Sequence, residues 1–108
     1  MINQNIIVLL DYIYITMTKP FNDTKTIISN IDLYNFRFPN DILEKNINYL
    51  DLTTLLKTQI LTYKFVIQYV LNNIYQITPE EKTIDIYDVI NKQPHLDINE
   101  LKNKMTTQ

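Results

Sequence analysis

Apolar residues recur at three- and four-residue spacing along most of this chain, a pattern typical of amphipathic helices. The first such segment covers residues 5–17 and is followed by Lys19-Pro20 and a polar connection. Between residues 27 and 38 the spacing fits a helix and a strand equally well. The apolar face of the first predicted helix comprises Ile6, Leu9, Leu10, Ile13 and Met17.

A second helix is predicted after Pro39-Asn40-Asp41, with Asp41 as its N-cap and Glu44 three residues later, as in a capping box. Its apolar residues are Ile42, Leu43, Ile47 and Leu50. Asp51 then caps the longest periodic segment of the chain. This segment contains neither glycine nor proline, so it predicts one continuous helix over residues 52–76. Its predicted buried stripe is Leu52, Leu55, Leu56, Ile60, Tyr63, Ile67, Val70, Leu71 and Ile74.

The tetrapeptide Thr78-Pro79-Glu80-Glu81 has the composition of a helix start. Threonine suits the N-cap, proline suits the first helical position, and Glu81 completes a capping box. The apolar side of this helix would carry Ile84, Tyr87, Val89 and Ile90. Asp97 and Glu100 repeat the capping pattern before a last helix, whose apolar residues are Ile98, Leu101 and Met105. The chain is therefore predicted to be mainly α-helical.

The composition describes one folded domain, since 45% of the 108 residues are apolar and eight are tyrosines. Ten basic and twelve acidic side chains give a net charge of -2, without a basic run that would indicate nucleic-acid binding. The apolar stretch from Ile6 to Met17 is interrupted by Asp11 and is too short to cross a bilayer. No basic segment precedes it, as one would in a secretory signal. We expect a cytoplasmic or nuclear protein that binds neither nucleic acid nor membrane.

Missing residue types exclude several kinds of catalytic site. Cysteine and glycine are absent, which removes thiolate metal sites and Gly-rich phosphate loops. His95 is the only histidine, which removes the usual ligand clusters and nucleophilic pairs, and beside Pro94 we expect it to be a solvated turn residue. Glu80 and Glu81 point about 100° apart on a helix and cannot flank one substrate atom. We expect no catalytic residue, no metal site and no cofactor.

The chain also lacks alanine and is rich in isoleucine, asparagine, tyrosine and lysine. AT-rich codons produce this bias. It indicates a source with an AT-rich genome, such as a large DNA virus or a parasite.

Several short motifs follow one another in a characteristic order. They are Asn48-Tyr49-Leu50-Asp51, Leu55-Leu56, Val70-Leu71-Asn72-Asn73-Ile74 and Thr78-Pro79-Glu80-Glu81. In this order they resemble the signature of the Skp-type adaptors of SCF ubiquitin ligases, which is Asn-Tyr-Leu-Asp, a Leu-Leu pair, a Val-x-Asn-x-Ile turn and Thr-Pro-Glu-Glu. The resemblance is closest over residues 42–81 and extends over about 31–101.

The resemblance implies the helical C-terminal part of a Skp/POZ fold, with the POZ β-strands largely absent. Residues 1–50 would form a truncated POZ-like helical part, and residues 51–108 the Skp-type dimerisation helices that bind an F-box. Between Leu56 and Val70 this chain is about seven residues longer than the family pattern, which corresponds to roughly two turns at 3.6 residues per turn. We therefore expect a lengthened helix with an unchanged buried face.

The resemblance also implies which residues contact partner proteins. Asn48 and Tyr49 would bind a cullin, although Tyr49 fits a half-buried core position equally well. The implied F-box contacts are Leu55, Leu56, Ile60, Ile67, Val70, Ile74, Pro79 and Glu80. About two thirds of the long apolar stripe is expected to serve the ordinary core.

These implications describe a non-enzymatic adaptor that binds an F-box protein, and a cullin as a second partner, in an SCF-type ubiquitin ligase. The alternative is a viral or assembly-structural helical protein that has lost the ligase contacts. Because the family's strands are missing, the apolar face of the helix over residues 5–17 lacks some of its cover. We expect self-association into a homo-oligomer, or a partner protein, to bury it.

Overall fold

The computed structural model of this protein describes residues 27–107, a range that is mainly α-helical and contains no β-strand. Its elements are α2 (Asn30–Asn35), α3 (Asn40–Lys45), the 3-10 helix η1 (Ile47–Tyr49), α4 (Leu52–Thr58), α5 (Tyr63–Phe65), the π-helix η2 (Val66–Val70), α6 (Pro79–Lys82), α7 (Ile86–Lys92) and α8 (Ile98–Thr106). The predicted mainly α-helical class is confirmed, and the ambiguous segment 27–38 contains a helix. The predicted helix over residues 5–17, and the self-association assigned to it, lie outside the described residues.

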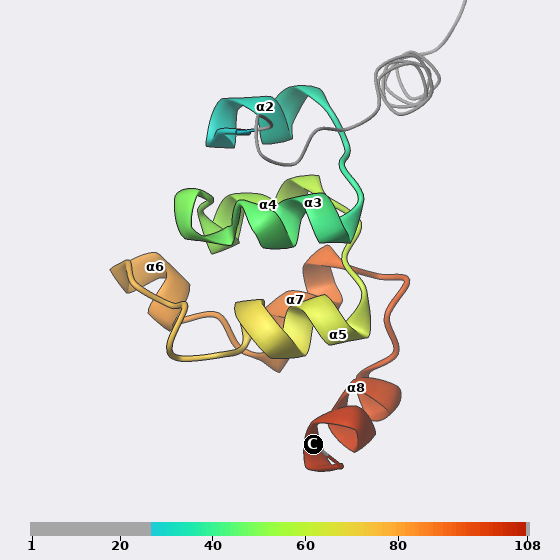
Figure 1. Cartoon of the computed structure of the whole chain (residues 1–108). Helices are drawn as coiled ribbons and strands as arrows, with labels where there is room; N and C mark the ends of the chain where they lie inside the picture. The colour runs from blue at the N-terminus through green and yellow to red at the C-terminus, as the bar shows by residue number, and fades with distance from the viewer. Residues whose placement is uncertain (1–26, 108) are drawn as a thin grey trace, which may run out of the picture.

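Helix α4 is the central element of the fold. It packs against α2, α6, α7 and η2. In Figure 1, α2 lies above α3 and α4, while α5 and α7 lie below them and α8 lies at the bottom. Segments that precede and follow α4 in the sequence therefore meet on it.

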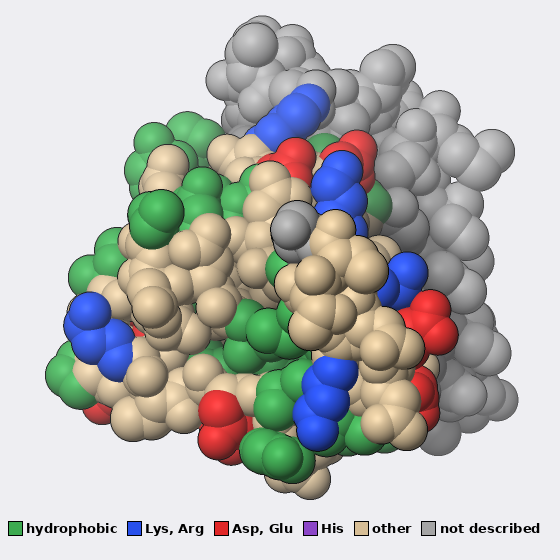
Figure 2. Space-filling view, turned by 90° about the horizontal axis from the view of Figure 1, so that it is seen from below, with side chains coloured by type: hydrophobic (Ala, Val, Ile, Leu, Met, Phe, Trp, Pro, Cys, Tyr) green, Lys and Arg blue, Asp and Glu red, His purple; other side chains and the backbone are tan. Residues whose placement is uncertain are grey.

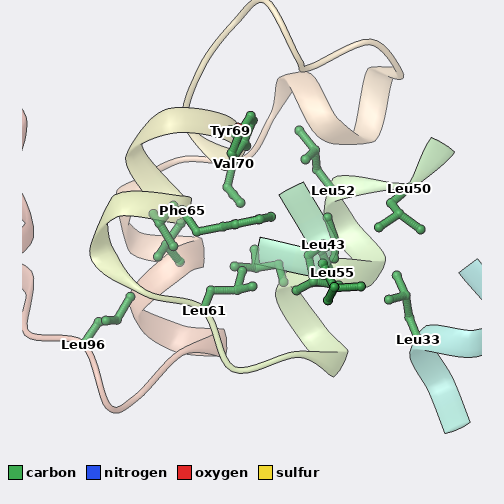
Figure 3. Packing of buried hydrophobic residues seen from close by; sticks show 14 of the residues in the cluster. Leu33, Leu43, Leu50, Leu52, Leu55, Leu61, Phe65, Tyr69, Val70 and Leu96 are labelled. Carbon is green, nitrogen blue, oxygen red and sulfur yellow. The ribbon is translucent and has the colours of Figure 1, made fainter. Parts of the chain in front are cut away.

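The buried side chains form one cluster around α4 (Figure 3). Leu43, Leu55, Val70 and Leu101 have no exposed surface, although each belongs to a different helix. Full burial of such a side chain contributes about 1.5–3 kcal/mol. The cluster begins at Ile28, so residues on both sides of position 50 share one core. The division into two parts at that position stays a prediction.

Helices α4, α6 and α8 begin as predicted. In each, the N-cap side chain accepts a hydrogen bond from the backbone N–H three residues later, at 2.9–3.1 Å. These N-caps are Asp51, Thr78 and Asp97. Glu81 completes the capping box of α6, and Pro79 is the first residue of that helix. Caps of this kind satisfy N–H groups that a helix start leaves without a partner.

The prediction of Asp41 as a helix N-cap is wrong. Helix α3 begins at Asn40, and its N-cap is Pro39 in an extended conformation, at φ -64° and ψ 151°. The Pro39 carbonyl accepts the N–H groups of Ile42 and Leu43 at 3.1 and 3.2 Å, so helical hydrogen bonding starts before Asp41. Asp41 lies in the first turn, where its charge suits the helix dipole.

The prediction of one continuous helix over residues 52–76 is also wrong. Helix α4 ends at Thr58, and Gln59 is extended at φ -113° and ψ 157°. A helix resumes only at α5, where the hydroxyl of Thr62 accepts the N–H of Phe65 at 3.1 Å. Helix α5 then passes directly into η2. The expected lengthening of a single helix by two turns is therefore wrong as well.

Side-chain amides from distant parts of the chain hold the break after α4. Nε2 of Gln93 donates to the carbonyls of Leu56 and Gln59, both at 2.7 Å, and its Oε1 accepts the N–H of Leu61 at 2.9 Å. Gln93 is almost completely buried. These bonds satisfy the carbonyls that a helix end leaves without a partner. Helical periodicity does not reveal them, because Gln93 lies 37 positions from Leu56.

Gln59 forms a second tie of this kind, between the ends of α2 and α4. Its Nε2 donates to the carbonyls of Leu33 and Phe36, and its Oε1 accepts the N–H of Phe38, each at 2.9 Å. Asn40 holds the following turn with one donated and one accepted hydrogen bond, also at 2.9 Å. Within residues 27–107, no buried side-chain nitrogen or oxygen lacks a hydrogen-bond partner. The buried amides of Gln59 and Gln93 that hold the break therefore have hydrogen-bond partners, as buried polar groups require.

The single helix predicted after Thr78 consists of two helices. Helix α6 has four residues, and Asp85 then caps α7 in a capping box with Asp88. Because α7 starts its own turn at Asp85, the prediction that Tyr87 lies on the apolar side is wrong. The Tyr87 side chain is 64% exposed, and the ammonium group of Lys102 lies 5.8 Å from its ring centre, a cation–π distance.

Candidate protein-binding site

The predicted F-box contacts divide into a buried set and an exposed set. Leu55, Leu56 and Val70 lie in the core, and Ile67 packs partly buried against it. These side chains do not reach a partner while the fold keeps this arrangement. The exposed members are Ile60 (55%), Ile74 (81%), Pro79 and Glu80. The prediction that Ile60 and Ile74 belong to a buried stripe is wrong. Ile60 lies between α4 and α5, and Ile74 lies after η2, so neither residue is part of a helix.

The predicted cullin contacts are both exposed. Asn48 and Tyr49 belong to η1, which has no buried residue. The Tyr49 side chain is 68% exposed, so its interpretation as a half-buried core tyrosine is wrong. The role of both residues in cullin binding stays a prediction.

The loop between η2 and α6 carries two strongly exposed isoleucines, Ile74 (81%) and Ile77 (75%). Oδ1 of Asn72 accepts the N–H of Ile74, and the carbonyl of Asn72 accepts the N–H of Tyr75, both at 3.0 Å. Gln76 is buried, and its Nε2 donates to the last carbonyl of η2 at 2.8 Å. The loop therefore has a defined conformation while its two aliphatic side chains face solvent.

Aromatic rings anchor this loop to the core. The ring of Tyr75 packs edge-on against Tyr69, with centroids 4.9 Å apart, and Tyr69 packs against Phe65 at 5.0 Å. Such pairs contribute about 0.5–1.5 kcal/mol beyond the area that they bury. Burial, together with a hydrogen bond to the Glu44 carboxylate, raises the pKa of Tyr69 to about 12. The Tyr69 hydroxyl is therefore protonated at neutral pH.

The carboxylate of Glu81 joins the same loop to the start of α4. One oxygen accepts the N–H groups of Ile77 and Thr78 at 2.9 and 2.8 Å, and the other accepts the N–H of Leu52 at 2.8 Å. Glu81 is only 4% exposed, so water molecules do not solvate its carboxylate. The three backbone N–H groups supply the hydrogen bonds that water would otherwise give. Helices α4 and α6 are consequently in contact. The exposed segments 47–49 and 74–80 thus lie at the same end of the molecule, at the left of Figure 1.

Asp51 forms the other carboxylate contact at the start of α4. Burial alone would raise its pKa, but hydrogen bonds from the hydroxyls of Thr53 and Thr54 and from the N–H of Thr54 lower the pKa below its ordinary value. The N–H of Asp51 itself donates to Oδ1 of Asn30 at 2.8 Å, which ties this turn to α2. The charged form of Asp51 therefore stabilises the fold.

We expect the free energy of unfolding of Asp51→Asn to decrease less between neutral and acid pH than that of the wild type. Because the folded pKa of Asp51 lies below the ordinary value of 3.8, its contribution is fully present above that value and is lost as the pH falls through the folded pKa. Urea unfolding measured from about pH 3 to pH 7 checks this expectation. Asp41→Asn, which changes an exposed carboxylate, is the matched control. If the free energy of unfolding of Asp51→Asn fell with decreasing pH as steeply as that of the wild type, the stabilising role of the Asp51 carboxylate would be contradicted.

The described residues contain no group of three or more His, Cys, Asp or Glu side chains placed to hold a metal ion. His95 lies between α7 and α8, and its Nε2 is 2.8 Å from the carbonyl of Leu61. The ring thereby supports the turn after α4, beside the Gln93 amide. We assign His95 a structural role.

One face of the molecule mixes apolar, basic and acidic side chains. Figure 2 shows hydrophobic side chains in several places on one face, with basic and acidic groups interspersed between them. An electrostatic footprint for nucleic acid would be a continuous basic face. None of the helices between residues 27 and 107 combines the length and the apolar character needed to span a bilayer.

The candidate site therefore consists of two segments with exposed side chains, residues 47–49 and 74–80, and the buried Glu81 carboxylate ties the second segment to the start of α4, just after the first. Ile77 and the bridging role of Glu81 were not predicted from the sequence, which indicated Glu81 only as a capping residue. Ile77 lies between two of the recognised motifs, and no local pattern shows that it is exposed.

No protein-family model, curated protein or solved structure matches this chain.

Proposed function

We propose that this protein is a non-enzymatic adaptor of the Skp type, which binds an F-box protein and, as a second partner, a cullin, in the cytoplasm or nucleus. The observation that carries the proposal is the exposure of Ile74 and Tyr49 on neighbouring segments. Both belong to motifs that resemble those of Skp-type adaptors. Large apolar side chains held in solvent at one end of a domain are typical of a protein-binding surface.

The loop over residues 74–80 would form the F-box contact. Its hydrogen bonds keep it ordered before binding, so less conformational entropy is lost when a partner docks. Burying Ile74 and Ile77 against an apolar partner surface provides most of the binding energy. Pro79 and Glu80 are exposed and lie at the edge of this contact. At such an edge the charge of Glu80 would favour binding of the correct partner.

The 3-10 helix η1 would form the cullin contact. Tyr49 presents a large ring and a hydroxyl group, and exposed tyrosines of this kind are common anchors of protein interfaces. Asn48 beside it offers an amide for hydrogen bonding. The two contacts are adjacent without overlapping, as an adaptor requires.

We expect Ile74→Asp to weaken binding of an F-box domain roughly tenfold or more, because a charge would replace an apolar anchor. The unfolding midpoint should stay unchanged, since Ile74 is 81% exposed. Fluorescence anisotropy with a labelled F-box domain measures the binding. Ile31→Asp is the matched control, because Ile31 is 72% exposed on α2 and is not a predicted contact.

Two results would count against this function. If folded wild-type protein failed to bind F-box domains, the assembly-structural alternative would be preferred. If wild-type protein bound and Ile74→Asp bound equally well, the contact would lie elsewhere on the molecule. Normal binding by Ile31→Asp is needed to show that the effect is local.

A further inference from the structure

Glu81 is the only acidic or basic residue among the buried side chains of residues 27–107. Capping of α6 accounts for one of its oxygens, which accepts the N–H groups of Ile77 and Thr78. The second oxygen accepts the N–H of Leu52, which lies 29 positions earlier and is the first residue of α4. One carboxylate therefore completes the starts of two helices.

This sharing makes the two helix starts dependent on each other. If the loop before α6 moves and takes Glu81 with it, the N–H of Leu52 loses its partner in a buried position. A buried donor without a partner carries its full desolvation cost, so the start of α4 should loosen at the same time. The capping oxygen of Asp51, Oδ2, is already bonded to Thr53 and Thr54.

We propose that Glu81 is a positioning residue that couples the two exposed segments, so that displacing residues 74–80 also loosens the turn at residues 48–52. The identity of the partners that would use this coupling rests on the proposed function. The coupling itself is a property of the free protein. It is reciprocal, so a ligand that favours one arrangement of the loop changes the affinity of the neighbouring segment.

Amide hydrogen exchange, measured by NMR on the free protein, tests the coupling. Glu81→Gln keeps the shape of the side chain but leaves one acceptor oxygen where the carboxylate has two. We expect exchange at Leu52, Ile77 and Thr78 to become faster together, by roughly tenfold or more. Glu80→Gln, which removes the same charge from an exposed neighbour, should leave these rates unchanged.

Thr78→Ala is a milder second variant, which carries the test if Glu81→Gln fails to fold. It removes the hydroxyl that accepts the N–H of Glu81 at 3.1 Å and leaves the carboxylate in place. Coupling predicts faster exchange of the backbone N–H groups of Leu52 and Ile77. The backbone N–H of Gln59, at the far end of α4, should keep its exchange rate.

The proposal is overturned if Leu52 keeps its rate in a folded variant in which Ile77 exchanges faster. It is also overturned if Gln59 accelerates equally, because that result reports unfolding of all of α4. Neither outcome depends on a partner protein. Failure of F-box binding would therefore leave the coupling standing, and failure of the coupling would leave the proposed function standing.

Discussion

Leu56→Asp is expected to leave the protein unfolded at room temperature. The Leu56 side chain is 4% exposed within the core cluster, and no lysine or arginine is among the buried residues of the range 27–107. An unpaired carboxylate in such a place costs several kcal/mol, a large part of the roughly 5–15 kcal/mol that stabilises a typical domain. Far-UV circular dichroism and urea titration would detect the loss of the helices.

Ile60→Asp is the matched control for this substitution. Ile60 lies four positions later and belonged to the same predicted stripe, but it is 55% exposed. We expect its free energy of unfolding to change by less than about 1 kcal/mol. A normally folded Leu56→Asp variant would show that the core does not contain this side chain as described.

Gln93→Leu is expected to lower the free energy of unfolding by about 3 kcal/mol or more. It leaves the carbonyls of Leu56 and Gln59 and the N–H of Leu61 without their partner, and each unpaired buried group costs roughly 1–3 kcal/mol. Urea unfolding monitored by circular dichroism gives the difference directly.

Gln68→Leu makes the same chemical change at an exposed position, where the amide donates to the hydroxyl of Tyr69 at 3.2 Å. We expect Gln68→Leu to change the free energy of unfolding by no more than about 0.5 kcal/mol. Equal losses in the two variants would contradict the role given to Gln93, since they would show that a leucine is disfavoured at either position for general reasons.

The helix starts were predictable because their hydrogen bonds are local. Asp51, Thr78 and Asp97 each bond to an N–H three residues later, so the whole interaction is visible in four consecutive residues. The cap of α7 has the same form but was not predicted. There Asp88 takes the place that glutamate or glutamine usually occupies in a capping box, after Asp85.

The break after α4 was not predictable from periodicity, because its cause lies elsewhere in the chain. The apolar spacing continues through Ile60, and nothing between residues 52 and 76 disfavours a helix strongly. The amides of Asn40 and Gln93 nevertheless bond the backbone in an extended form. Tertiary hydrogen bonds here outweigh local helix propensity.

The candidate site was predictable in part for the same reason. The motif resemblance indicated Tyr49, Ile74 and Glu80, which are exposed, together with Leu55 and others that the core contains. Which apolar residues of a periodic segment face solvent depends on where the helix breaks. The sequence pattern therefore identified candidate contacts without separating them from the core.

Both ends of α4 are completed by side chains that are synthesised later, Glu81 at its first residue and Gln93 at its last carbonyls. With seven residues, α4 is far shorter than the roughly 12–15 residues that an isolated helix needs for marginal stability in water. A nascent chain that has not yet emerged from the ribosome through residue 93 lacks the Gln93 contact at the end of α4, and before residue 81 emerges it lacks both contacts. The central helix should therefore form late in synthesis, in one cooperative step with the segments that surround it.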